Sequence, residues 1–166
     1  MRYSDGPTLE LSTVVEGATP EQVWDLITDI TLPVKVSPEL QSVEWLDGAD
    51  AVVPGARFVG SNVNPALGSW STTAVVAEVD PGRRWVWNIE GFEPGHVMAT
   101  WAFEVEPSSK GAVLRQWARM GPSPSGLSIA ISRMPEKEAR IVSRRLEEWR
   151  VGIQANLDYV NRTLGG

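Results

Sequence analysis

Apolar residues repeat with helical spacing over the last thirty positions of the chain. From residue 135 to residue 164 they recur every three or four positions, which places them on one stripe of an α-helix. The stripe consists of Val142, Leu146, Trp149, Ile153, Leu157, Val160 and Leu164. At about 1.5 Å per residue, the predicted helix is roughly 45 Å long.

Most of the chain before this helix alternates between apolar and polar residues, as β-strands do. The pattern predicts seven strands, at 8–15, 42–46, 56–63, 69–79, 83–90, 97–105 and 112–120. The strands from residue 56 onward follow one another through short Gly- and Pro-containing turns, which indicates antiparallel hairpins.

Two segments between these strands and the long helix predict shorter helices. Thr19 fits an N-cap, Pro20 the first helical position and Gln22 the capping-box position, so a helix should begin there. Pro33 and Pro38 then divide the region into two short helices. The segment 121–134 opens as a loop and should hold a short helical turn near 126–132.

These elements predict one α+β domain covering residues 1–166. A curved antiparallel seven-strand sheet should wrap around the long C-terminal helix, with two short helices after the first strand. A sheet that wraps a helix often leaves a cavity between the two, which suggests a protein that holds a small molecule.

Strand parity predicts which side chains face that cavity. Glu78 is taken to mark the outer face of strand 69–79, so that Ser71, Thr73, Val75, Ala77 and Val79 should point inward. On the other strands the inward sets are largely aromatic or aliphatic, and include Phe58, Trp85, Trp87, Trp101, Phe103 and Leu114. The neutral polar residues Asn62, Ser71, Thr73 and Gln116 complete a wall that suits an apolar ligand.

Composition narrows the function classes. A net charge of −6 argues against nucleic acid as the main partner. The absence of cysteine and the presence of a single histidine exclude thiol chemistry and a multi-His metal centre, and no metal or other cofactor is expected. Neither a signal peptide nor a membrane span is visible, so we expect a cytoplasmic protein.

Several residues allow two interpretations. His96 is the natural candidate for a general acid or base, but it follows a Pro-Gly turn, and a solvated loop residue is the favoured interpretation. Gln116 could line the pocket or bond to its neighbours in the sheet. Asn62 could bind ligand or end its strand in an Asx-turn. The charged series from Glu136 to Glu148 is interpreted as a solvated helix face.

The order of elements and several phrases resemble the START-like (SRPBCC) superfamily, whose helix-grip fold includes polyketide cyclases, dehydrases and lipid-transport proteins. The phrases are ATPEQVWDLITDI at 18–30, PGARFVGSN at 54–62, VAEVDPGRRWVWNIEG at 76–91 and WAFEVEP at 101–107. The closing segment from 121 to 160 resembles actinobacterial members. The resemblance implies a ligand between the sheet and the long helix, with Asn62, Trp87 and Trp101 at matching positions.

The leading hypothesis is therefore a binding protein for an apolar or aromatic small molecule such as a lipid or polyketide. Trp149 and Ile153 should contact that ligand from the long helix. One alternative is a polyketide cyclase, aromatase or dehydrase that uses His96 and Gln116. Cyclase members rely on a pocket arginine, however, whereas Arg84, Arg115 and Arg119 fall on the predicted outer face. The other alternative is a protein-interaction module, and the oligomeric state, including a homodimer, is left open.

Overall fold

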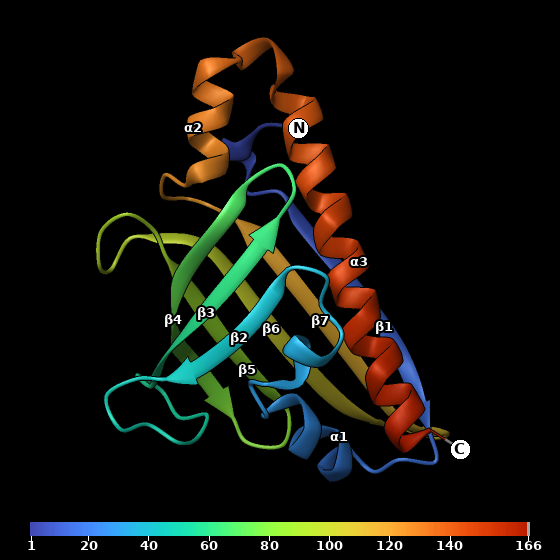
Figure 1. The fold of residues 1–166 in the computed structure, drawn as a ribbon. Coiled ribbons are helices and arrows are strands. Elements are labelled where there is room, and N and C mark those ends of the chain that lie inside the picture. Colours follow the sequence, from blue (N-terminus) through green and yellow to red (C-terminus); the bar gives the residue numbers. More distant parts are fainter. Residues whose placement is uncertain (166) are drawn as a thin grey trace.

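The computed structural model describes residues 1–165 and contains a curled sheet of seven antiparallel strands (Figure 1). The strand order across the sheet is β1-β7-β6-β5-β4-β3-β2. The strands are β1 (Thr8–Glu16), β2 (Leu40–Trp45), β3 (Arg57–Asn64), β4 (Gly68–Asp80), β5 (Arg84–Glu90), β6 (Val97–Ser108) and β7 (Gly111–Met120). All seven predicted strands are present.

The predicted helices are also present, except that the second of the two short helices after β1 is a 3₁₀ turn. They are α1 (Pro20–Ile27), α2 (Gly126–Arg133) and α3 (Glu138–Leu164), and 3₁₀ turns occupy Tyr3–Asp5, Leu32–Lys35 and Pro135–Lys137. Thr19 and Gln22 form the predicted capping box, with reciprocal side-chain bonds of 3.1 and 2.9 Å to the backbone. The predicted α+β helix-grip architecture is therefore confirmed.

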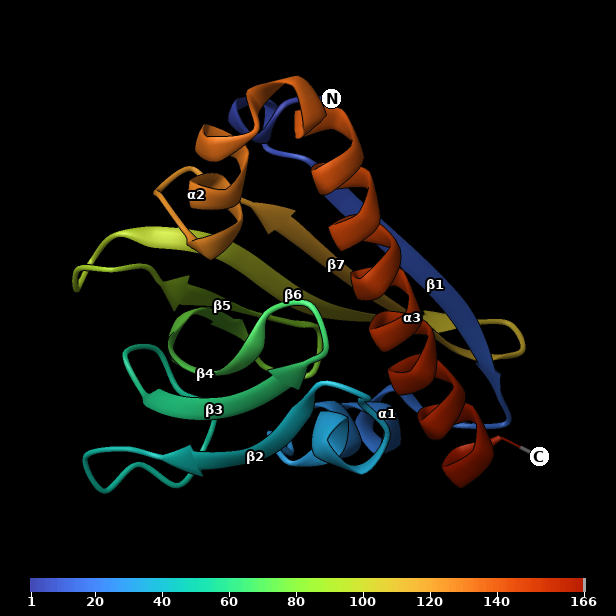
Figure 2. The same cartoon turned by 45° about the horizontal axis from the view of Figure 1, so that its top comes forward.

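The long helix α3 runs along the open side of the curled sheet, while α1 lies at one end of the sheet and α2 at the other (Figure 2). The C-terminal half of α3 packs on β1 and β7, where Ile153, Leu157 and Val160 are buried against Val15 and Leu114. This half of the helix forms a filled core. The N-terminal half is joined by side-chain bonds to the end of β3 and to the residue before β2.

One part of the inward pattern was predicted wrongly. Ala74 and Val76 of β4 are buried and pair with Ile89 and Trp87, so they face inward, whereas Thr73 pairs with Val59 on the other face. The register shifts between Val76 and Glu78, which indicates a β-bulge. The outward position of Glu78 therefore predicts the faces of β4 residues only on its own side of the bulge. As a result, the sequence pattern assigned Ser71, Thr73, Val75 and Ala77 to the wrong face.

Candidate functional site

A cavity of about 230 Å³ lies between the concave face of the sheet and the middle of α3. Its walls come from the six strands β2 to β7, from the segment before β2, and from one side of α3. Five of the predicted ligand-binding residues line it: Asn62, Trp87, Trp101, Gln116 and Trp149. The cavity thus lies between the strand residues that were predicted to face inward and the apolar stripe of α3.

A row of tryptophan rings runs along one wall of this cavity. Trp87 and Trp101 lie on neighbouring strands with their ring centroids 6.4 Å apart, and Trp101 meets Trp149 of α3 at 4.9 Å. Behind them Trp85 stacks on Trp87 at 4.2 Å and donates its indole N–H to the Ile27 carbonyl at 3.0 Å. That bond to the end of α1 orients Trp85, on which Trp87 stacks, and the ring faces of the row form an apolar surface.

Two side-chain amides, one from β7 and one from α3, bond to each other on another part of the cavity wall. Asn156 Nδ2 donates a hydrogen bond of 3.0 Å to Gln116 Oε1, and both side chains are nearly inaccessible, at 5% and 1% exposure. Both also line the cavity. Asn156 Oδ1 is buried and has no hydrogen-bond partner among the described residues. Such an orphaned acceptor is rare in a folded protein.

Gly152 occupies the α3 position between Trp149 and Asn156 that faces the cavity. A Cβ at this position would meet no atom within 4 Å. Glycine in the middle of a helix costs roughly 0.5–1 kcal/mol relative to alanine. The helix therefore carries a destabilising residue at the point where a larger one would fill the cavity.

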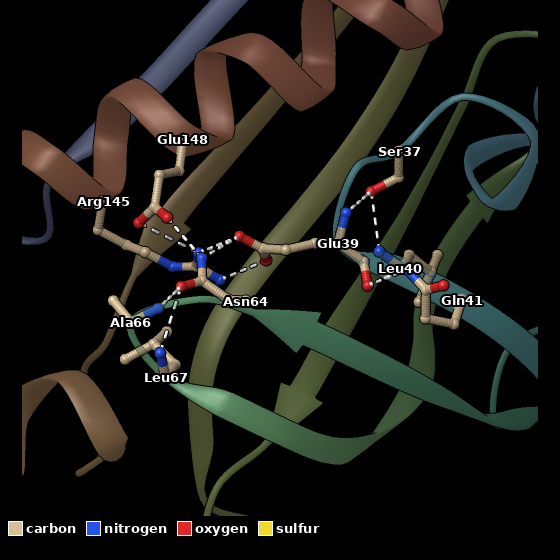
Figure 3. A network of polar contacts seen from close by, with 9 residues as sticks. All are labelled: Ser37, Glu39, Leu40, Gln41, Asn64, Ala66, Leu67, Arg145 and Glu148. Carbon is tan, nitrogen blue, oxygen red and sulfur yellow. Dashed lines mark hydrogen bonds and ion pairs between the residues drawn. The ribbon is translucent and has the colours of Figure 1, made fainter.

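A charged cluster lies at the side of the cavity (Figure 3). The Arg145 guanidinium donates to both oxygens of Glu39, at 2.6 and 3.0 Å, and lies 3.5 Å from Glu148 Oε1. Asn64 Nδ2 bonds the same two carboxylates, at 2.9 Å to Glu39 and 2.5 Å to Glu148. Asn64 Oδ1 accepts from the backbone N–H groups of Ala66 and Leu67, which fixes the amide orientation.

The cluster joins α3 to the start of β2 and the end of β3. Its arginine is only 14% exposed and also lies over the Trp70 ring, 5.8 Å from the centroid. Glu39, Arg145 and Glu148 are the charged residues that line the cavity within the described chain. Because these charges bond one another, the remaining surface offered to a ligand is apolar or neutral.

A second, wider recess of about 610 Å³ adjoins the cavity. The two share Trp70, Thr72, Met98, Ala99, Arg145 and Trp149, and α2 contributes Gly126 and Leu127 to the outer one. Tyr3 lines this recess and donates its hydroxyl to the Ser123 carbonyl at 2.7 Å. Burial raises the pKa of Tyr3, and a hydrogen bond with Ser125 opposes this shift.

Three of the predicted site residues lie outside the cavity. Ile153 is fully buried in the core beside it, and Thr73 faces the other way, toward the outer recess. His96 is in the loop between β5 and β6, where its side chain is 56% exposed and lies 3.5 Å from the Glu93 carboxylate. The structure therefore gives His96 the solvated loop position and not the inward position that the cyclase alternative required.

Five residues of the site were not predicted from the sequence: Glu39, Asn64, Arg145, Gly152 and Asn156. Glu148 was assigned to a solvated helix face but is part of the cluster. The signal for two of them was present: Gly152 and Asn156 follow Trp149 at three and seven positions, on the same helical stripe. The partners Glu39 and Asn64 lie 106 and 84 positions from their helix contacts, so spacing could not reveal them.

The described residues contain no group of three or more His, Cys, Asp or Glu side chains arranged to hold a metal ion. No helix among residues 1–165 is long and apolar enough to cross a membrane.

Comparisons with known proteins agree with this architecture. The family model described as polyketide cyclase/dehydrase and lipid transport matches residues 7–148. A search of curated proteins found no match. The solution structure of the polyketide-cyclase-like protein Cgl2372 from Corynebacterium glutamicum is similar, with 29% identity, a TM-score of 0.62, and coverage of 95% of this chain and 90% of that one.

A second similar structure shows the fold alone. The di-domain ARO/CYC BexL from the BE-7585A biosynthetic pathway has a TM-score of 0.68 at 13% identity. The match covers 96% of this chain and 50% of BexL.

Proposed function

We propose that this chain, which belongs to the polyketide cyclase/dehydrase and lipid transport family, binds an aromatic small molecule in the cavity between its sheet and α3. The observation that carries the proposal is the chemistry of the cavity wall. Trp87, Trp101 and Trp149 present apolar ring surface, and the polar groups beside them are neutral amides. Apolar surface with a few placed polar groups is typical of small-molecule sites.

The volume of the cavity favours a compact ligand. A dry cavity of about 150 Å³ can hold benzene, so a cavity of about 230 Å³ suits a molecule with two fused rings. The outer recess shares six lining residues with the cavity, and a longer ligand would extend into it past Trp70 and Arg145.

Binding is favoured over catalysis by the position of the ionisable groups. Proton transfer needs an acid or base within hydrogen-bond reach of the reacting atom. His96 lies in an exposed loop, and the ionisable side chains that do line the cavity, Glu39, Arg145 and Glu148, are bonded to one another. Cyclisation is the second candidate function. It is supported by the presence of Glu148 on the wall, and it would require that carboxylate to leave Asn64.

The test compares two leucine substitutions on neighbouring residues of α3. Gly152→Leu places a side chain in the cavity, whereas Val151→Leu adds one methylene on an exposed position of the same helix turn. Isothermal titration calorimetry with 2-methylnaphthalene, a probe without polar groups, measures the affinity of each protein. We expect the wild type and Val151→Leu to bind alike and Gly152→Leu to lose binding at least tenfold.

Equal binding by Gly152→Leu would place the ligand elsewhere, and absence of binding by the wild type would overturn the proposal. The cyclase alternative is tested separately, with a linear poly-β-ketone chain as substrate. Turnover that disappears in Glu148→Gln but persists in Glu147→Gln would establish it, since Glu147 lies beside it on the exposed side of α3 and pairs with Arg150.

A further inference from the structure

The Gln116–Asn156 pair forms a polar subsite in which each amide keeps one group that can bond a ligand. Gln116 belongs to β7 and Asn156 to α3, and the two amides bond at 3.0 Å while lining the cavity. Each is more than nine-tenths buried. Gln116 uses its carbonyl oxygen in this bond, so its NH₂ group is the donor that the pair retains. Asn156 Oδ1 is the acceptor that has no partner within residues 1–165.

This result does not depend on which way the two amides point. If both amides are turned over, Gln116 donates to Asn156, and the pair still keeps one carbonyl oxygen and one NH₂ group. A buried acceptor without a partner is costly, so the cavity should favour an occupant that satisfies it. The occupant must therefore bring a proton to one amide oxygen and offer a lone pair to the neighbouring NH₂.

We propose that this pair recognises a neutral hydroxyl group on the aromatic ligand. The hydroxyl donates its hydrogen to Asn156 Oδ1 and accepts a hydrogen bond from the Gln116 NH₂ group. A hydroxyl does both with a single oxygen, whereas an ether only accepts and a carboxylate cannot donate at neutral pH. This inference rests on the proposed function, because it names the ligand chemistry of the same cavity.

Other features of the site point the same way. Trp149 is seven positions before Asn156 on the cavity side of α3, and Gly152 lies between them, so an aromatic ring on the tryptophan row can reach the amides past the missing side chain. The cation that lines the cavity, Arg145, already holds Glu39 through two bonds. An anionic ligand would therefore lack a free counter-charge and would lose its hydration on entry.

The experiment measures the affinities of four naphthalene compounds by isothermal titration calorimetry at pH 7. They are 2-naphthol, its methyl ether 2-methoxynaphthalene, 2-methylnaphthalene and the anion 2-naphthoate. The wild type should bind 2-naphthol about tenfold more tightly than the ether, since satisfying a buried acceptor is worth roughly that factor. The anion should bind most weakly.

The variants Asn156→Leu and Asn156→Leu with Gln116→Met remove the subsite with side chains of similar size. The quantity compared is the ratio of the 2-naphthol and ether affinities within each protein, which cancels general changes of the cavity. The ratio should fall from about ten to about one in both variants, and Val151→Leu should keep the wild-type ratio. The double variant removes both partners of the bond, so it leaves neither amide unpaired if the single change impairs folding.

Equal affinity of the wild type for 2-naphthol and the ether would overturn the proposal and would mean that water satisfies Asn156. Tightest binding of 2-naphthoate would also overturn it and would assign polar recognition to Arg145. If 2-methylnaphthalene and the other three all fail to bind, the proposed function itself fails. If 2-methylnaphthalene binds and 2-naphthol gains nothing over it, only the hydroxyl subsite fails.

Discussion

Arg145 and Glu39 join α3 to the start of β2 beside the cavity. Two nitrogens of the guanidinium donate to the two carboxylate oxygens, at 2.6 and 3.0 Å, and the residues lie 106 positions apart in the chain. A bidentate pair fixes both distance and orientation. Because the same arginine lines the cavity and its outer recess, this bond holds the N-terminal half of the helix over the site.

Loss of this bond should destabilise the protein. Arg145→Met keeps the apolar stem of the side chain and removes the guanidinium, which leaves Glu39 and Glu148 close together, since Asn64 binds both. We expect the free energy of unfolding to fall by about 1–3 kcal/mol, less than for a fully buried pair because the carboxylates are partly exposed. Urea denaturation followed by tryptophan fluorescence measures this change.

Arg150→Met is the matched control for that prediction. Arg150 pairs with Glu147 on the exposed side of the same helix, so its loss should leave stability nearly unchanged. A double-mutant cycle of Arg145→Met and Glu39→Gln should show a coupling energy above about 0.5 kcal/mol. Equal effects of the Arg145 and Arg150 substitutions would contradict the role given to the cluster.

Gly152→Ala should make the protein more stable and its cavity smaller. The added methyl group meets no atom within 4 Å, so the helix gains about 0.5–1 kcal/mol without strain. Thermal unfolding measures this gain. The opposite result is expected for Gly111→Ala, where φ is 150° and the new Cβ would clash with the Val15 carbonyl oxygen. A loss of stability in Gly152→Ala would show that this position is filled.

Glu104 should stabilise the protein at neutral pH and not at low pH. Burial alone would raise the pKa of its carboxyl group, but hydrogen bonds from Trp117 and Arg115 and the charges of Arg84 and Arg115 outweigh it and lower the pKa. A lowered folded-state pKa contributes stability above the ordinary value of 4.5, and that contribution is lost as the pH falls through the folded value.

Glu104→Gln should therefore be less stable than the wild type at pH 7, by about 1–3 kcal/mol, because three donors lose their charged acceptor. The difference should shrink below pH 4.5. Denaturation curves at several pH values test this. Glu106→Gln, at an exposed position on the same strand, serves as the control. A difference that stays constant with pH would contradict the pKa argument.

His96→Ala should leave the affinity for 2-methylnaphthalene within about twofold of the wild type. The side chain is exposed in the loop between β5 and β6 and does not line the cavity, so nothing in the proposed site depends on it. Calorimetric titration measures this directly. A tenfold loss of affinity would mean that this loop closes over the ligand and brings His96 to it.

The fold could be predicted from sequence because its signals are local or periodic. The helical stripe from Val142 to Leu164 and the capping residues Thr19 and Gln22 depend on neighbours a few positions away. Strand alternation likewise gave the inward positions of Trp87, Trp101 and Gln116. These residues line the cavity because both periodicities are set by backbone geometry.

The remaining features depend on register and on contacts between distant segments. The bulge in β4 reverses which alternate residues face inward, so the position of Glu78 could not predict the face of Thr73. The charges of Arg145 and Glu148 have the spacing of an exposed helix face, and only the folded chain brings Glu39 and Asn64 to them. The orphaned oxygen of Asn156 likewise appears only when α3 packs against β7.

The central claim is that an aromatic ligand occupies the cavity, and the eight tryptophans of the chain allow a direct test. In a ¹H–¹⁵N spectrum each indole N–H gives its own signal. Addition of 2-methylnaphthalene should shift the signals of Trp70, Trp87, Trp101 and Trp149, which line the cavity. Those of Trp24, in α1, and Trp117, bonded to Glu104 outside the cavity, should stay in place. Unchanged cavity signals, or shifts confined to Trp24 and Trp117, would contradict the claim.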